Sequence, residues 1–174
     1  MKTTHVIAIT LSSFLLLSCT GEKENSSAEE PASSPLSGIF LNEKPGEAIT
    51  VTEVRETAKP GDSVVVEGKI AGVMNPFTEG YASVVLANED LKTCDLIPGD
   101  ECPTPWDACC VAPEQLKEQR ITIQVPGEDG LPVAEGLKGV NGLEEMDLLV
   151  VTGVVNESST DENLVLDLTG IYRK

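Results

Sequence analysis

The chain has 174 residues, with 29 acidic side chains against 12 Lys and Arg residues and a net charge of −17. With so few basic residues the chain lacks the row of Lys and Arg side chains with which proteins bind phosphate backbones. DNA and RNA are therefore not expected partners. The single histidine, His5, lies in the N-terminal segment. The rest of the chain therefore has no Ser-His-Asp or Cys-His mechanism and no histidine-bearing metal site.

Residues 1–18 are predicted to be a signal peptide. Lys2 precedes an apolar run that is too short to span a bilayer with ease. The run ends in Leu-Leu-Ser-Cys, which resembles the lipobox of bacterial lipoproteins. The resemblance implies cleavage before Cys19 and acylation of that cysteine, for example with palmitate, where each buried methylene contributes roughly 0.8 kcal/mol to anchoring. The alternative is an ordinary secretory signal or a membrane helix in which Cys19 is incidental.

Residues 19–47 are predicted to form a disordered tether, because Ser, Glu and Pro dominate its first half. The folded domain is expected at residues 48–174. Near its start, Thr50 and Glu53 have the spacing of a capping box, which favours a short helix. The β-branched residues around them favour a strand, and we expect the helix.

Five strands are predicted, at residues 63–71, 81–87, 120–125, 147–155 and 164–172. The first alternates, with Lys69 on the expected solvent face, and Gly68 allows it to bend. Between the third and fourth strands, three glycines limit any helix to a short piece. The runs G-D-S-V-V-V-E-G-K-I and M-D-L-L-V-V-T-G-V-V resemble the first and fourth strands of OB-fold barrels. We therefore expect a mainly β fold, a five-stranded OB-fold-like Greek-key barrel, with a β-sandwich as the alternative.

A cysteine-rich insertion is predicted between the second and third strands, at residues 88–119, ending in a short helix. Its thiols are Cys94, Cys102, Cys109 and Cys110. An even count in an exported chain predicts two disulfides, each worth roughly 2–4 kcal/mol. Cys109 and Cys110 are adjacent, so each is expected to pair outward, in one of two ways. The spacing C-x7-C-x6-C-C differs from that of structural zinc sites and contains no C-x-x-C, so no metal or other cofactor is expected.

The stretch C-P-T-P-W-D-A-C-C, residues 102–110, resembles a family of uncharacterised exported bacterial proteins, associated with planctomycete-like genomes, that carry a C-P-T-P-W-D-x-C-C signature. The resemblance brings no activity. Trp106 is predicted to hold this loop on the barrel as a rigid cap, and Asp107 to cap a turn. The alternative places both against a ligand or partner. Phe77, in the loop after the first strand, is a candidate stacking residue, but no aromatic series and no basic groove is predicted.

The expected function is a non-enzymatic, membrane-anchored binding or assembly module of the bacterial cell envelope, facing the periplasm or the outside. Its partner would be an envelope protein or a small ligand. Two alternatives remain: an OB-fold protein that binds oligosaccharides or oligonucleotides, and a cysteine-dependent metal or redox protein. No catalytic constellation is recognised in the sequence.

Overall fold

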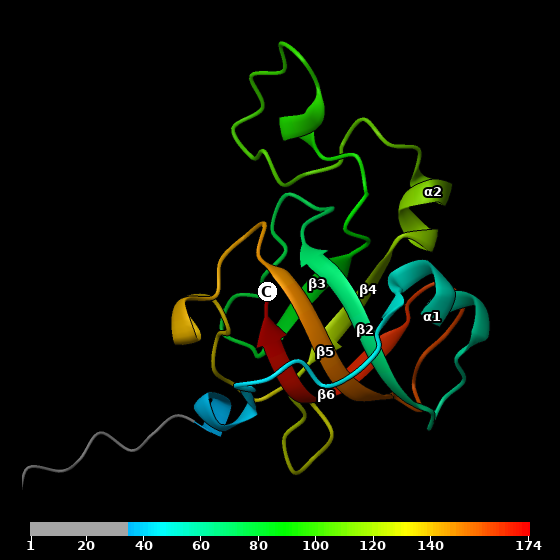
Figure 1. Ribbon diagram of the computed structural model, residues 1–174, viewed down its shortest axis with the longest axis vertical. Helices are drawn as coiled ribbons and strands as arrows, with labels where there is room; N and C mark the ends of the chain where they lie inside the picture. Colours follow the sequence, from blue (N-terminus) through cyan, green and yellow to red (C-terminus); the bar gives the residue numbers. More distant parts are fainter. Residues whose placement is uncertain (1–34) are drawn as a thin grey trace, which may run out of the picture. The chain divides into compact units, whose positions relative to one another are not determined.

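The computed structural model describes residues 35–174, and five of its strands close into a barrel. These are β2 (Ser63–Ile70), β3 (Ser83–Ala87), β4 (Arg120–Gln124), β5 (Leu148–Val155) and β6 (Val165–Arg173). Their order is β2-β3-β4-β6-β5, and β5 pairs back onto β2 (Figure 1). All of these pairings are antiparallel except β4–β6. A five-stranded Greek-key barrel of this kind confirms the predicted OB-fold-like class over the β-sandwich.

A sixth strand and the helices surround this barrel. The two-residue strand β1 (Ile49–Thr50) pairs in parallel with β2. The helices are α1 (Val51–Thr57) and α2 (Pro113–Glu118), with 3-10 turns η1 (Pro35–Ile39), η2 (Cys94–Leu96) and η3 (Val140–Gly142). No helix in residues 35–174 has the length and apolarity needed to cross a membrane.

The predicted capping box is present at the start of α1. The Thr50 hydroxyl accepts the Glu53 N–H at 3.2 Å, and the Glu53 carboxylate accepts the Thr50 N–H at 2.8 Å. These hydrogen bonds to Thr50 also lower the pKa of Glu53. The N–H groups of Thr50 and Glu53 have no partner within the helix, and these two hydrogen bonds satisfy them. This explains why a helix forms among β-branched residues.

The folded domain begins before residue 48, so the predicted boundary is wrong. Leu36 is fully buried in the barrel core. Phe40 bridges to Ile171 on β6, and the Leu41 N–H donates to the Ile171 carbonyl at 2.7 Å. The apolar residues at the end of the predicted tether therefore cover one edge of the barrel. The remaining tether residues, the signal peptide and Cys19 lie outside the described residues.

Strands β5 and β6 approach closely at a register shift between Thr152 and Gly153. A Cβ atom at Gly153 would lie 2.5 Å from the Asp167 carbonyl oxygen and 2.8 Å from the Leu166 Cγ. No side chain fits in that space, so glycine is what allows the two strands to pair here. The irregularity bends β5 into the closed barrel.

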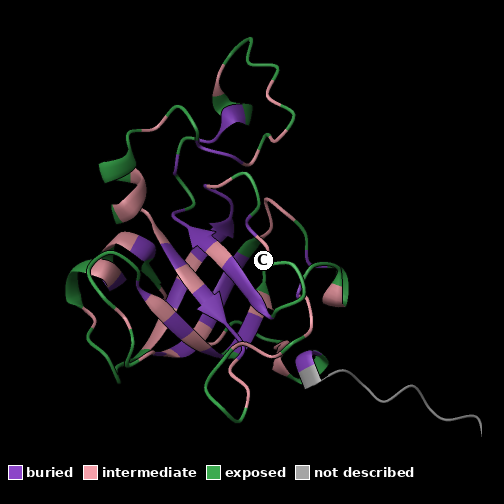
Figure 2. Cartoon of the chain, turned by 180° about the vertical axis from the view of Figure 1, so that it is seen from behind, coloured by how far each residue is buried: buried purple, intermediate pink, exposed green. Residues whose placement is uncertain are grey.

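Residues 88–119 join β3 to β4, and only the base of this segment packs on the barrel. A small second core of Ala87, Leu91 and Ala108 holds the base, with Val111 and Leu116 against it. Beyond it the chain projects past the end of the strands, and most of the projection is exposed (Figures 1 and 2). The segment is thus a projecting loop instead of the expected cap. That residues 88–119 are an insertion relative to other OB-fold barrels stays a prediction.

Candidate functional site

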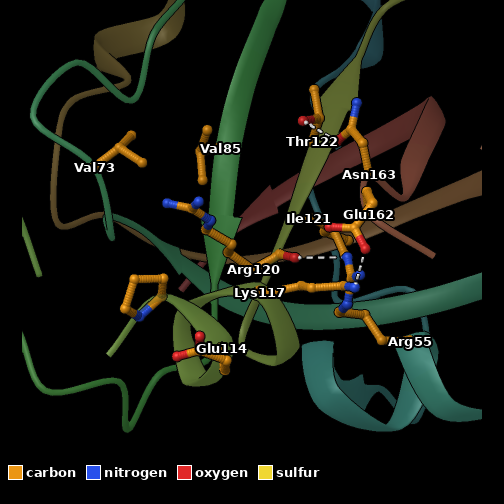
Figure 3. Close-up of a pocket in the computed structure, with 11 residues that line it drawn as sticks. Arg55, Val73, Val85, Glu114, Lys117, Arg120, Ile121, Thr122, Glu162 and Asn163 are labelled. Atoms are coloured by element: carbon orange, nitrogen blue, oxygen red, sulfur yellow. Dashed lines mark hydrogen bonds and ion pairs between the residues drawn. The ribbon is translucent and has the colours of Figure 1, made fainter. Parts of the chain in front are cut away.

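A pocket of about 660 Å³ opens on the face of β3 and β4 (Figure 3). The two strands supply Val85 and residues 120–122. The β2–β3 loop supplies Val73, and the β5–β6 loop supplies Glu162 and Asn163. Helices α1 and α2 complete the wall with Arg55, Pro113, Glu114 and Lys117. OB-fold barrels usually present their ligands to the second and third barrel strands and to the loops joining the first and second and the fourth and fifth strands. These are the corresponding elements of this chain.

The pocket gathers Arg55, Lys117 and Arg120, three of the chain's 12 basic residues. The Arg55 guanidinium donates to the Arg120 carbonyl at 3.2 Å and also to the Asp161 carbonyl. The Arg120 guanidinium donates to the Gly72 carbonyl at 3.3 Å. Carbonyl partners fix both guanidinium groups, and neither group forms an ion pair within residues 35–174, although the Glu162, Asp161 and Glu118 carboxylates act electrostatically on the charge of Arg55. Lys117, in contrast, forms an ion pair with Glu162.

The two ends of the pocket differ in chemistry. Figure 3 shows the Arg120 guanidinium pointing away from the Lys117–Glu162 pair, toward Val73 and Val85. A hollow of about 280 Å³ shares Arg55 and Lys117 and is bounded by the β5–β6 loop. One end thus combines a guanidinium with apolar walls, an arrangement suited to an anionic group on a partly apolar small molecule.

Sequence reasoning missed this pocket and predicted no basic groove. Its cations come from α1, α2 and the first residue of β4, and only Lys117 and Arg120 are close in sequence. The guanidinium of Arg55 is partly buried in the wall of the pocket, and this burial lowers its pKa. Only the closure of the barrel brings Arg55 beside the other two, so a linear pattern could not reveal it.

The thiols of the projecting loop form a second cluster. The Cys94 and Cys109 sulfurs are 3.6 Å apart, and those two and the Cys102 sulfur all lie within 4.8 Å of one another. The Cys110 sulfur is 3.9 Å from that of Cys109. All four cysteines are free, whereas a disulfide needs about 2.05 Å between sulfurs. The two predicted disulfides are therefore not formed in this structure, in which three sulfurs converge on one point.

The environments of these thiols differ. Burial, together with the neighbouring Cys109 and Cys102 thiols, raises the pKa of Cys94 to about 12. Hydrogen bonding from Thr104, whose hydroxyl oxygen lies 3.3 Å from the Cys102 sulfur, lowers the pKa of Cys102. Hydrogen bonding with Cys109 raises the pKa of Cys110. Cys102 is thus the thiol whose surroundings favour the thiolate.

Trp106, Asp107 and Phe77 do not form one site. Trp106 is half-buried between two loops: its indole N–H donates to the Met74 carbonyl at 2.9 Å, and its own carbonyl accepts the Gly72 N–H at 2.8 Å. The buried Asp107 carboxylate accepts the N–H of the next residue at 2.8 Å, within a turn. Phe77 lines a separate pocket of about 300 Å³. There the Lys138 ammonium lies 5.8 Å from the Phe77 ring centroid.

No protein-family model and no curated protein matches the chain. Among solved structures, the hypothetical protein ygiW from E. coli is similar, with 13% sequence identity and a TM-score of 0.38. The similarity covers 74% of this chain and 91% of that one. A likeness at this level says nothing about function.

Proposed function

We propose that this protein is a membrane-anchored, non-enzymatic binding module of the bacterial cell envelope, and that the β3–β4 pocket holds a small carboxylate, acidic sugars included. The observation that carries the proposal is the pair of arginines, Arg55 and Arg120, whose assigned partners are carbonyl oxygens. An anion entering the pocket meets two guanidinium groups, neither of which is held in an ion pair.

The charge balance limits the size of the ligand. The pocket walls hold three cations and two carboxylates, whereas the whole chain carries −17. A long polyanion such as DNA would extend beyond the pocket and be repelled by the net negative charge of the protein. A small carboxylate would fit inside it, with its carboxylate on a guanidinium and its apolar atoms on Val73, Val85 and Ile121.

Saturable binding of a matched pair of sugars tests this function. Galacturonate and galactose differ in the carboxylate that the proposal requires. We expect the full-length protein in detergent, dialysed against each radiolabelled sugar, to bind galacturonate at one site and galactose far more weakly. Equal binding of the two sugars, or no saturable binding of galacturonate, would contradict the proposed ligand class.

The anchor is predicted to be an acyl group on Cys19, on the strength of the lipobox-like sequence that precedes it. Cells grown with labelled palmitate should incorporate the label into the wild-type protein. Cys19→Ala should lose the label, and Cys110→Ala, which removes a thiol of the projecting loop, should retain it. Label that persists in Cys19→Ala would place the lipid elsewhere and refute the anchor.

A further inference from the structure

We propose that Cys94, Cys102 and Cys109 bind one zinc ion in the loop that joins β3 to β4. Four sulfurs each about 2.3 Å from a tetrahedral zinc lie about 3.8 Å from one another. The measured separations, 3.6 Å between the Cys94 and Cys109 sulfurs and no more than 4.8 Å within the triad, are close to this spacing. They are far longer than a disulfide bond.

Backbone hydrogen bonds assemble the triad from distant parts of the loop. The Cys94 N–H donates to the Asp107 carbonyl at 2.8 Å, and the Asp95 N–H donates to the Pro105 carbonyl at 3.1 Å. These two bonds place the start of the loop beside its end. At the tip, the Asp100 carboxylate accepts the Cys102 N–H at 2.9 Å. These three hydrogen bonds bring the main chain at the three cysteines close enough for their sulfurs to converge.

The adjacent pair of cysteines does not prevent such a site, because only one of the pair joins the triad. Cys109 contributes its sulfur, while Cys110 lies beside it at 3.9 Å. The fourth zinc position is then left to a water molecule.

The projecting part of the loop needs a cross-link of some kind. From residue 95 to residue 103 every side chain is exposed except for the half-buried Ile97 and Cys102, so no apolar core orders this part. A disulfide joins only two points of the chain. One zinc ion joins all three points, and its binding free energy contributes directly to folding.

The charge of the loop also favours a cation. Between Lys92 and Lys117 the chain has no basic residue, and the loop carries Asp95, Asp100, Glu101 and Asp107. A bound divalent cation would offset the negative charge of these carboxylates. Thiolates are soft ligands that select zinc, which displaces their protons to solvent as it binds. Neither the cysteines nor the four acidic residues of the loop line the β3–β4 pocket, so the zinc site stands independently of the proposed ligand.

Cobalt titration tests the site directly. The full-length chain with Cys19→Ser, which leaves only the four loop thiols, is purified in detergent under anoxic reducing conditions. We expect one equivalent of Co²⁺ to produce thiolate-to-cobalt charge-transfer bands and intense tetrahedral d–d bands, and one equivalent of Zn²⁺ to abolish them. Cys94→Ser, Cys102→Ser and Cys109→Ser should each weaken cobalt binding by more than about 100-fold, beyond the usual effect of second-shell changes.

Two controls make the outcome decisive. Cys110→Ser should keep the one-to-one stoichiometry and the tetrahedral spectrum; loss equal to that of the triad variants would overturn the assignment of three ligands. Cys102→Ser changes a side chain outside both apolar cores, so its circular dichroism should match that of the parent. Absence of cobalt binding by the reduced parent would refute the site. Native protein that has two disulfides and no zinc would refute it as well.

Discussion

Replacement of Leu166 by alanine is expected to lower the free energy of unfolding by about 3–5 kcal/mol, the upper range for buried leucines. Leu166 is fully buried on β6. Its backbone pairs with Ile123 on β4 on one side and with Val155 on β5 on the other. The cavity would open where β6 lies between β4 and β5. Gly153, which lies beside the Leu166 side chain, has no side chain of its own that could fill it.

Urea denaturation of the full-length chain in detergent, followed by circular dichroism, measures this loss. Leu131→Ala is the matched control, because Leu131 is 63% exposed in the loop between β4 and β5. It should change the free energy of unfolding by no more than about 0.5 kcal/mol. Equal losses for the two variants would mean that Leu166 does not belong to a packed barrel core.

Reversal of one charge in the β3–β4 pocket is expected to weaken galacturonate binding by about 100-fold, in the range found for buried charged hydrogen-bonding pairs. In Arg120→Glu the guanidinium that points toward Val73 and Val85 is replaced by a carboxylate (Figure 3). The ligand would lose an ionic hydrogen bond and meet a like charge. Equilibrium dialysis of the variant measures the change in dissociation constant.

Lys44→Glu supplies the control for this reversal. Lys44 is exposed, does not line the pocket, and undergoes the same change in net charge. If the pocket holds the ligand, Lys44→Glu should leave the dissociation constant within about twofold of wild type, since exposed charges interact only weakly. If both variants weaken binding equally, the overall charge of the protein governs binding and the pocket does not.

Much of the barrel could be read from the sequence because its signals are local. Apolar patterns, alternating in some strands and continuous in the fourth, marked each strand to within a few residues, and the Thr50–Glu53 pair marked the start of α1. The helical segment predicted between β4 and β5 is limited to the three residues of η3. Gly139 before it and Gly142 at its end adopt positive φ values, which a longer helix does not allow. These features depend on neighbours along the chain.

Features that depend on distant segments could not be predicted. Alternation placed Lys69 in solvent, yet it is 4% exposed, and its ammonium donates to the Leu91 carbonyl at 2.7 Å and the Thr93 hydroxyl at 3.2 Å. The base of the projecting loop covers that face of β2, which satisfies the buried charge. The β3–β4 pocket likewise forms only when the barrel closes. The thiol triad forms only when the projecting loop brings Cys94, Cys102 and Cys109 together.

Our proposal places a small anion in the β3–β4 pocket of the protein as it exists in the cell. Native mass spectrometry of wild-type protein and Arg120→Glu, extracted in mild detergent from equivalent membranes, tests it most directly. We expect the wild-type protein to bear the extra mass of a small anionic molecule, beyond its acyl chains and any zinc, and Arg120→Glu to lack it. The same bound mass on both proteins, or none on either, would contradict it.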